Sequence, residues 1–269
     1  MIWFFIKKNF FDGWENIINI LIPNLLTIGL LLIGAAGFCF IYMANPLAVF
    51  LIYLMCLVII ALIIVFVSAF AKNALAIANF ETATLGGYFS EIGNAFKENI
   101  KFAFMVSFII VSAVIGVPLY INMNSFYGVM LGMILLFFAI LMMLAFQWYI
   151  PLKVLLGGDF KKTIKKCFII LFDNFGFSIF MALYSIVLTA LSVFLLLTLP
   201  GFNGVLLAQV NALRLRMYKY DWLDQHPDRK SEKKRKSIPW EALLKEDEAV
   251  LGKKSIKSLF MPWKAEHED

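Results

Sequence analysis

The side chains best suited to bind or conduct a solute are neutral amides within or beside long apolar segments. Asn24, Asn99 and Asn174 are evenly spaced, 75 residues apart, and each follows a segment with apolar residues at helical spacing. An Asn side chain can cap backbone groups at a corner between helices, and capping is the interpretation we favour. The alternative is a polar ring that lines an opening. The other candidate pathway residues are Gln147, Gln209 and Asn211.

The residue patterns of common reaction centres are missing from the sequence. There is no phosphate-binding loop, no Ser-His-Asp or Cys-His arrangement and no HExxH motif. Cys39, Cys56 and Cys167 lack paired spacing, and His226 and His267 lie in the hydrophilic C-terminal part. We therefore predict that the protein is not an enzyme and has no catalytic, cofactor-binding or metal site.

Charge is absent from the apolar segments, which limits the kind of transport they could support. A proton or cation pathway usually keeps an ionisable residue within the membrane, whereas a neutral solute needs none. Four hydroxyl side chains fall on one helical face, as a solvated pathway would require, but small polar residues also let helices approach closely. We favour helix packing for these four residues, which are Ser178, Ser185, Thr189 and Ser192.

Three windows, residues 16–71, 102–152 and 174–213, contain no Asp, Glu, Lys or Arg. About 20 apolar residues cross a bilayer as a helix, so each window is long enough for two crossings. Breaks at Asn45-Pro46, at 122–125 and at 200–204 predict the turns. We predict an all-α, polytopic membrane helix bundle with six crossings in three hairpins, although the last crossing has a re-entrant alternative. The expected spans are 17–43, 47–71, 102–121, 126–152, 175–199 and 205–218.

Each hairpin is preceded by a segment whose apolar residues recur at helical spacing. Such segments predict amphipathic helices at the membrane interface, and the third one carries Lys residues on its polar face. Gly86-Gly87 and Gly157-Gly158 open the second and third segments in matching positions. With the even spacing of the asparagines, this predicts an internal repeat with a pseudo-threefold arrangement.

Lys and Arg gather between and after the apolar windows, while the predicted hairpin turns carry no charge. The positive-inside rule then places the segments between hairpins and both termini in the cytoplasm. The basic surplus follows this topology and does not indicate nucleic-acid binding. We predict a transmembrane domain over 1–222 and a basic, amphipathic cytoplasmic tail over 223–269.

The tail combines a polybasic run with apolar residues and a short predicted helix over 239–251. Anionic lipid headgroups attract such a run electrostatically, so one interpretation returns the tail to the membrane surface. Docking on a cytoplasmic protein partner is the other. The residues expected at the membrane surface are Lys233, Lys234, Arg235, Lys236, Trp240 and Trp263.

The region 10–222 resembles the YesL-like family of bacterial integral membrane proteins. The resemblance lies in the hydropathy plan, in Ala95-Phe96-Lys97-Glu98-Asn99 before the second hairpin, and in the Leu199-Pro200 break before a short last span. It implies a protein of the bacterial inner membrane, in a family of unknown function that is often associated with carbohydrate uptake systems, with no catalytic residues.

Two functional hypotheses follow. The first is an accessory or permease-like membrane protein for small neutral solutes such as carbohydrates, which a polar water-accessible cavity would favour. The second is a non-transporting scaffold or assembly factor whose tail recruits a transporter or other membrane-protein partner. A dry, closed bundle with an ordered tail would favour the second.

Overall fold

The computed structural model describes residues 1–45, 48–226 and 238–252, and in these ranges the chain forms helices and no strand. The prediction of an all-α protein is confirmed for them. Five helical stretches in these ranges are long and apolar enough to cross a membrane. They are α2 (Ile17–Ala44), α3 (Val49–Ala69) with α4 (Ala71–Ala78), α5 (Leu85–Ile121), α6 (Phe126–Phe146) with α7 (Tyr149–Leu156), and α9 (Phe175–Phe194).

Contacts divide the chain into two compact units. One is Phe11–Arg214, and the other joins Met1–Phe10 to the described residues from Leu215 onward. The larger unit contains all five candidate spans. The smaller one contains α12 (Trp240–Leu251), which begins after Pro239 and ends at Gly252, where φ is 60°. The short helix predicted over 239–251 is therefore confirmed.

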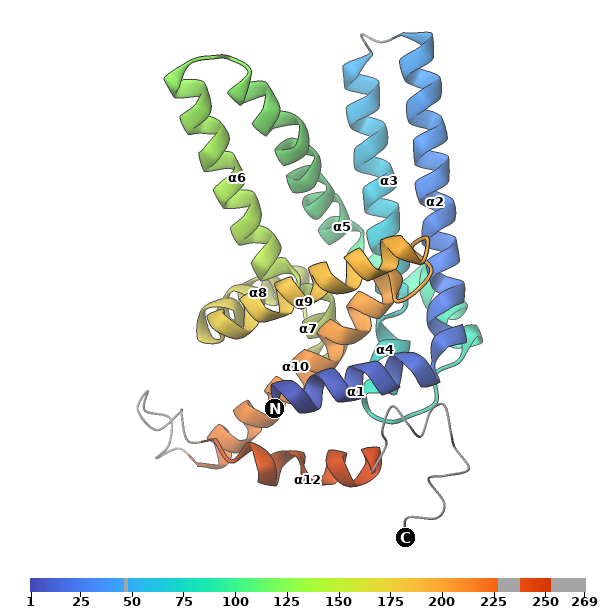
Figure 1. Cartoon of the computed structure of the whole chain (residues 1–269), viewed down its shortest axis with the longest axis vertical. Helices are drawn as coiled ribbons and strands as arrows, with labels where there is room; N and C mark the ends of the chain where they lie inside the picture. Colours follow the sequence, from blue (N-terminus) through green and yellow to red (C-terminus); the bar gives the residue numbers. More distant parts are fainter. Residues whose placement is uncertain (46–47, 227–237, 253–269) are drawn as a thin grey trace. The chain divides into compact units, whose positions relative to one another are not determined.

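Two antiparallel hairpins, α2–α3 and α5–α6, dominate the larger unit, and α3 packs against α5 between them. In Figure 1 the C-terminal end of α2, the N-terminal end of α3 and the turn between α5 and α6 lie at the top, and α4 and α7 lie at the opposite ends of the hairpins. The second turn falls at 122–125 as predicted, and Ser125 Oγ caps α6 by accepting a hydrogen bond from the Gly128 N–H at 3.1 Å. Many large apolar side chains of these helices are exposed, as a lipid-facing surface requires.

The third predicted turn is wrong in its position. The sequence places it at 200–204, but α9 already ends at Phe194 and α10 (Gly201–Gln225) begins at Gly201. The intervening segment turns at Leu196 and Leu197, both with positive φ, and contains the cis peptide bond Leu199–Pro200. Ser192 Oγ of α9 accepts a hydrogen bond from the Gly201 N–H, and Asn24 Oδ1 of α2 accepts one from the Asn203 N–H, so α10 can begin directly after the proline.

The helix α10 is not among the five candidate spans. Its first half is buried by other helices of the larger unit: Leu206, Leu207 and Val210 join the apolar core with side chains of α2, α3, α4 and α5. Further along, α10 carries Arg214 and Arg216. In the first half of the segment predicted as the last crossing, neighbouring helices therefore replace lipid as the apolar environment.

The predicted interfacial helices differ from one another in how they join the spans. The first, α1 (Ile2–Glu15), is separated from α2 by Asn16. The second is continuous with the span in α5. The third, α8 (Phe160–Asp173), is a separate helix that meets α9 at Asn174. Of the three asparagines expected at equivalent corners, Asn24 lies inside α2, Asn99 lies inside α5, and Asn174 lies between two helices.

Candidate functional site

A pocket of about 400 Å³ lies where α3 and α4, α5 and α7 meet, in the larger unit. We call it the polar pocket, because it contains side chains of both charges together with amides and a hydroxyl at the ends of apolar helices. Its polar lining residues are Ser68, Lys72, Asn79, Glu81, Glu91, Asn94, Glu98, Asn99 and Lys153.

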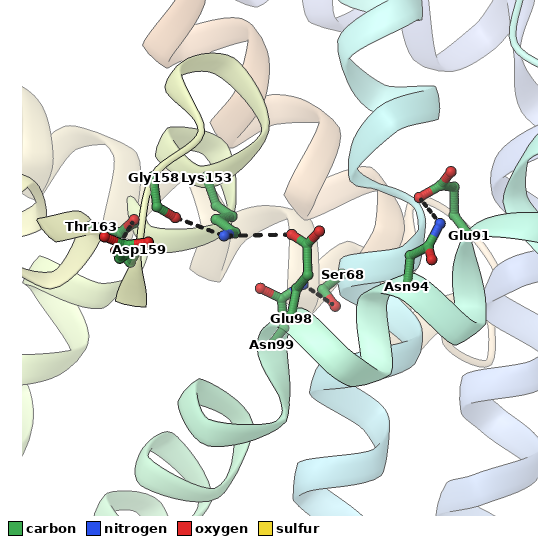
Figure 2. A network of polar contacts seen from close by, with 9 residues as sticks. All are labelled: Ser68, Glu91, Asn94, Glu98, Asn99, Lys153, Gly158, Asp159 and Thr163. Atoms are coloured by element: carbon green, nitrogen blue, oxygen red, sulfur yellow. Dashed lines mark hydrogen bonds and ion pairs between the residues drawn. The ribbon is translucent and has the colours of Figure 1, made fainter. Parts of the chain in front are cut away.

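Two ion pairs connect α5 to its neighbours around the pocket. Lys72 Nζ on α4 lies 2.7 Å from Glu91 Oε1, and Lys153 Nζ on α7 lies 3.4 Å from Glu98 Oε2. Lys153 Nζ also donates to the Gly158 carbonyl at 2.7 Å, as Figure 2 shows. In both pairs one side chain is well exposed, so water screens the attraction and the charged groups can still contact a solute.

Asn99 lies at a bend in the ribbon of α5 and is buried (Figure 2). Its Nδ2 donates to Ser68 Oγ at 3.1 Å, and Ser68 Oγ donates to the Val65 carbonyl at 2.8 Å. Within the described part of the chain, no donor reaches Asn99 Oδ1. A buried acceptor without a donor costs about 1–3 kcal/mol, which a ligand N–H or O–H could recover.

Asn24 serves a structural role at the start of α10. Its Nδ2 donates to the Thr198 and Pro200 carbonyls at 2.8 and 2.9 Å. Its Oδ1 accepts hydrogen bonds from the Asn203 N–H at 3.0 Å and from Asn203 Nδ2 at 2.8 Å. The N–H groups of a first helical turn lack partners within the helix, so Asn24 caps α10 from another helix. The capping role that the sequence favours therefore fits Asn24. The helix that it caps, however, is α10, which lies much later in the sequence, rather than a helix beside Asn24 itself.

The other sequence-predicted residues lie in different surroundings. Asn174 Nδ2 donates to the Ile170 carbonyl at 3.5 Å and to Asp173 Oδ2 at 3.3 Å. Gln147 Nε2 donates to the Leu144 and Ser178 carbonyls at 2.9 and 3.0 Å, and so joins α6 to α9. The structure therefore brings neither residue into the polar pocket, and of the three asparagines only Asn99 lines it.

Gln209 and Asn211 both lie on α10. Asn211 is buried, and its Nδ2 donates to Asp12 Oδ2 at 2.9 Å. Gln209 is half-buried. Nearby, Arg214 Nε donates to Asn79 Oδ1 at 2.7 Å and connects α10 to the segment that follows α4. These contacts hold α10 in the larger unit, and the amides form no continuous row.

The hydroxyl side chains of α9 mostly bond to protein groups. Ser178 Oγ accepts from Trp148 Nε1 at 3.0 Å, and Thr189 Oγ1 donates to the Ser185 carbonyl at 2.8 Å. Ser192 Oγ donates to the Leu188 carbonyl at 2.7 Å and accepts from the Gly201 N–H at 2.8 Å. This use of the hydroxyls agrees with helix packing rather than with a solvated stripe.

Trp240 is the one predicted tail residue within the described ranges. It begins α12 and is half-buried, with the Arg216 guanidinium carbon 5.5 Å from the centre of its ring. This arrangement resembles a cation–π contact within the smaller unit. The remaining tail predictions, Lys233, Lys234, Arg235, Lys236 and Trp263, lie outside the described residues.

Sequence reasoning missed most of the polar pocket. Lys72 and Lys153 are among the Lys and Arg residues between the apolar windows that predict the topology, and neither they nor Glu91 and Glu98 were predicted as site residues. The ion pairs join residues of different helices, and helical spacing cannot show such contacts. The charge-bearing segments between the windows were the available signal, since polar side chains at the ends of neighbouring spans can face one another.

Comparison of the chain with family models, curated proteins and solved structures found no match. Among the described residues, no group of three His, Cys, Asp or Glu side chains is placed to hold a metal ion. What this part of the chain establishes is a helical protein with five helices apolar enough to span a membrane. Its most developed polar site is the pocket around Asn99.

Proposed function

We propose that this membrane protein binds a small polar solute without net charge in the polar pocket, in an accessory or permease-like role. The observation that carries the proposal is a pocket lined by both cations and carboxylates, with Asn99, whose buried Oδ1 has no donor, among its lining residues. Such a lining can bond to hydroxyls and can balance both ends of a zwitterion. The resemblance to YesL-like proteins makes a carbohydrate the first candidate.

A scaffold or assembly factor is the second candidate, and the folded, packed state of α12 favours it. In the smaller unit, Leu244 and Leu251 are buried, and the Tyr218 hydroxyl donates to the Asp247 carboxylate at 3.2 and 3.3 Å. Part of the tail is thus a packed helix that could present a surface to a partner. Solute binding in the polar pocket would decide for the first candidate.

The test of the first candidate is direct binding of glucose, maltose and glycine betaine to the purified full chain. We expect Glu98→Gln combined with Lys153→Gln to weaken binding about tenfold or more, because hydrogen bonds to charged groups contribute about 1.5–3 kcal/mol. The control removes a similar ion pair outside the pocket, Asp159–Lys162 at the start of α8, with Asp159→Asn and Lys162→Gln. Equal affinities of both variants, or no binding of any probe, would contradict the proposal.

Asn99→Ala separates binding from folding. Asn99 Oδ1 is already without a donor, and Ser68 Oγ keeps its hydrogen bond to the Val65 carbonyl in the variant. We therefore expect the melting temperature to change little, while solute binding is lost. A large fall in melting temperature with unchanged binding would instead give Asn99 a purely structural role.

We also propose that the chain crosses a bacterial inner membrane six times, with a pseudo-threefold repeat of helix and hairpin and with both termini in the cytoplasm. Within the larger unit, the turn between α5 and α6 lies at one end of the hairpins, while α4 and α7, which carry Lys72 and Lys153, lie at the other, and this arrangement supports the topology. A sixth crossing by α10 would be protein-enclosed rather than lipid-facing.

Cysteine labelling tests this topology. A membrane-impermeant maleimide applied outside should label a cysteine at Asn124 and leave one at Ser231 unlabelled, in a background without Cys39 and Cys56. Burial raises the pKa of the remaining native thiol, Cys167, to about 12, so it stays protonated at pH 7 and reacts little. External labelling at Ser231 would refute the sixth crossing.

A further inference from the structure

The outer face of α8 combines basic side chains at one end with large apolar side chains at the other. Its first two turns carry Lys161, Lys162, Lys165 and Lys166, all exposed or half-exposed. Its last two turns expose Ile169 and Phe172, at 53% and 66%. Residues three and four apart lie on the same side of a helix, so these six side chains share one face.

The opposite face of α8 fixes this orientation. Thr163, Cys167 and Leu171 are fully buried, and α8 packs against α6 and α7. At its start, the Thr163 hydroxyl donates to the Asp159 carbonyl at 3.0 Å. Turning the lysines inward would expose the buried apolar groups and desolvate charge, so the basic face points away from the unit's core.

Little negative charge offsets this face within α8. The Asp159 carboxylate lies 3.5 Å from Lys162 Nζ, and both side chains are highly exposed, so water screens the pair. Asp173 is the acidic residue at the other end of the helix. A polyanionic surface would therefore meet a strong local excess of positive charge.

We propose that the outer face of α8 binds the headgroups of anionic phospholipids. The lysines contact phosphate groups, while Ile169 and Phe172 pack among the upper acyl chains. A soluble acidic protein would match the charge, but it would leave the apolar half of the face unexplained. The helix α9, a candidate span, begins at Phe175, so the apolar end of α8 adjoins the segment that enters the bilayer.

The experiment compares the thermal stability of the full chain in detergent micelles containing phosphatidylglycerol or phosphatidylcholine. We expect phosphatidylglycerol to raise the melting temperature by several degrees more than phosphatidylcholine, and added salt to reduce the difference. Lys161→Gln with Lys165→Gln should remove at least half of it. Lys97→Gln with Lys101→Gln is the matched control, because it removes two exposed lysines at the same spacing from α5.

Three outcomes would overturn the proposal. One is an equal effect of both lipids on the unmodified chain. Another is an equal loss of the lipid effect in the α8 and α5 variants, which would mean that the effect depends on the net charge of the protein and not on the face of α8. The third is stabilisation by soluble polyglutamate as large as that by phosphatidylglycerol, which would assign the face to an acidic protein. The folded state of each variant is checked in phosphatidylcholine, where the melting temperature should match that of the unmodified chain.

Discussion

Replacement of Asn24 by alanine should lower the free energy of unfolding by about 2–4 kcal/mol. The change removes the donor to the Thr198 and Pro200 carbonyls and the acceptor for two N–H groups of Asn203. Asn24 and Asn203 are fully buried, so water cannot easily replace these bonds. Pro200 keeps one partner, because its carbonyl also accepts from the Gly204 N–H. The measurement is unfolding of the purified protein by heat and by denaturing detergent.

Asn94→Ala is the control for this prediction. Asn94 is an exposed residue of α5, and its side chain makes one long contact, at 3.5 Å, with Glu91 Oε2. Its replacement should change stability by no more than about 0.5 kcal/mol. If both variants unfold alike, the capping of α10 by Asn24 contributes nothing to stability.

Gly201→Ala tests the same contact between Asn24 and the start of α10 by changing the residue on α10. Gly201 has φ of 61°, a conformation that favours glycine, and a Cβ at this position would overlap the Asn24 amide. The substitution should therefore destabilise the protein as Asn24→Ala does. Combining both changes should cost less than their sum, because the smaller side chain at position 24 leaves room for the new methyl group.

The helices that cross the apolar windows could be predicted from sequence because their signal is local. The span expected over 17–43 is α2, and the turn expected at 122–125 separates α5 from α6. Both depend on runs of apolar residues and on a polar break. The predicted position of the turn after α9 is wrong because a Pro and two Gly residues favour a turn locally. In the structure, Ser192 of α9 and Asn24 of α2 accept hydrogen bonds from the first turn of α10, so the helix begins within the predicted turn.

The polar pocket could not be predicted because its defining contacts join distant segments. Asn99 was found through its spacing from Asn24 and Asn174, but that spacing gave no indication that Ser68 would be its partner. Likewise, Lys153 and Glu98 meet across two helices. Sequence gives the charge of such residues, while helix packing decides which of them face a common space.

The last expected result concerns Gly128, where α6 lies against the backbone of α5. A Cβ at Gly128 would overlap the Tyr120 carbonyl oxygen, which is backbone and cannot rotate away, and would touch Met123 Cβ at 3.0 Å. Gly132, one turn further along α6, also lies against α5 near Tyr120. Small residues at such spacing let two membrane helices approach closely. Gly128→Ala should therefore force the two helices apart near their turn.

The expected cost is about 1–3 kcal/mol, although alanine is the better helix former by about 1 kcal/mol. Gly93→Ala is the matched control, because Gly93 is an exposed helical residue of α5 with open space around its would-be Cβ. It should leave stability unchanged or raise it. Opposite signs for the two substitutions would show that the close approach of α5 and α6 overrides helix propensity at Gly128, and equal signs would mean that the hairpin adjusts freely to the added methyl group.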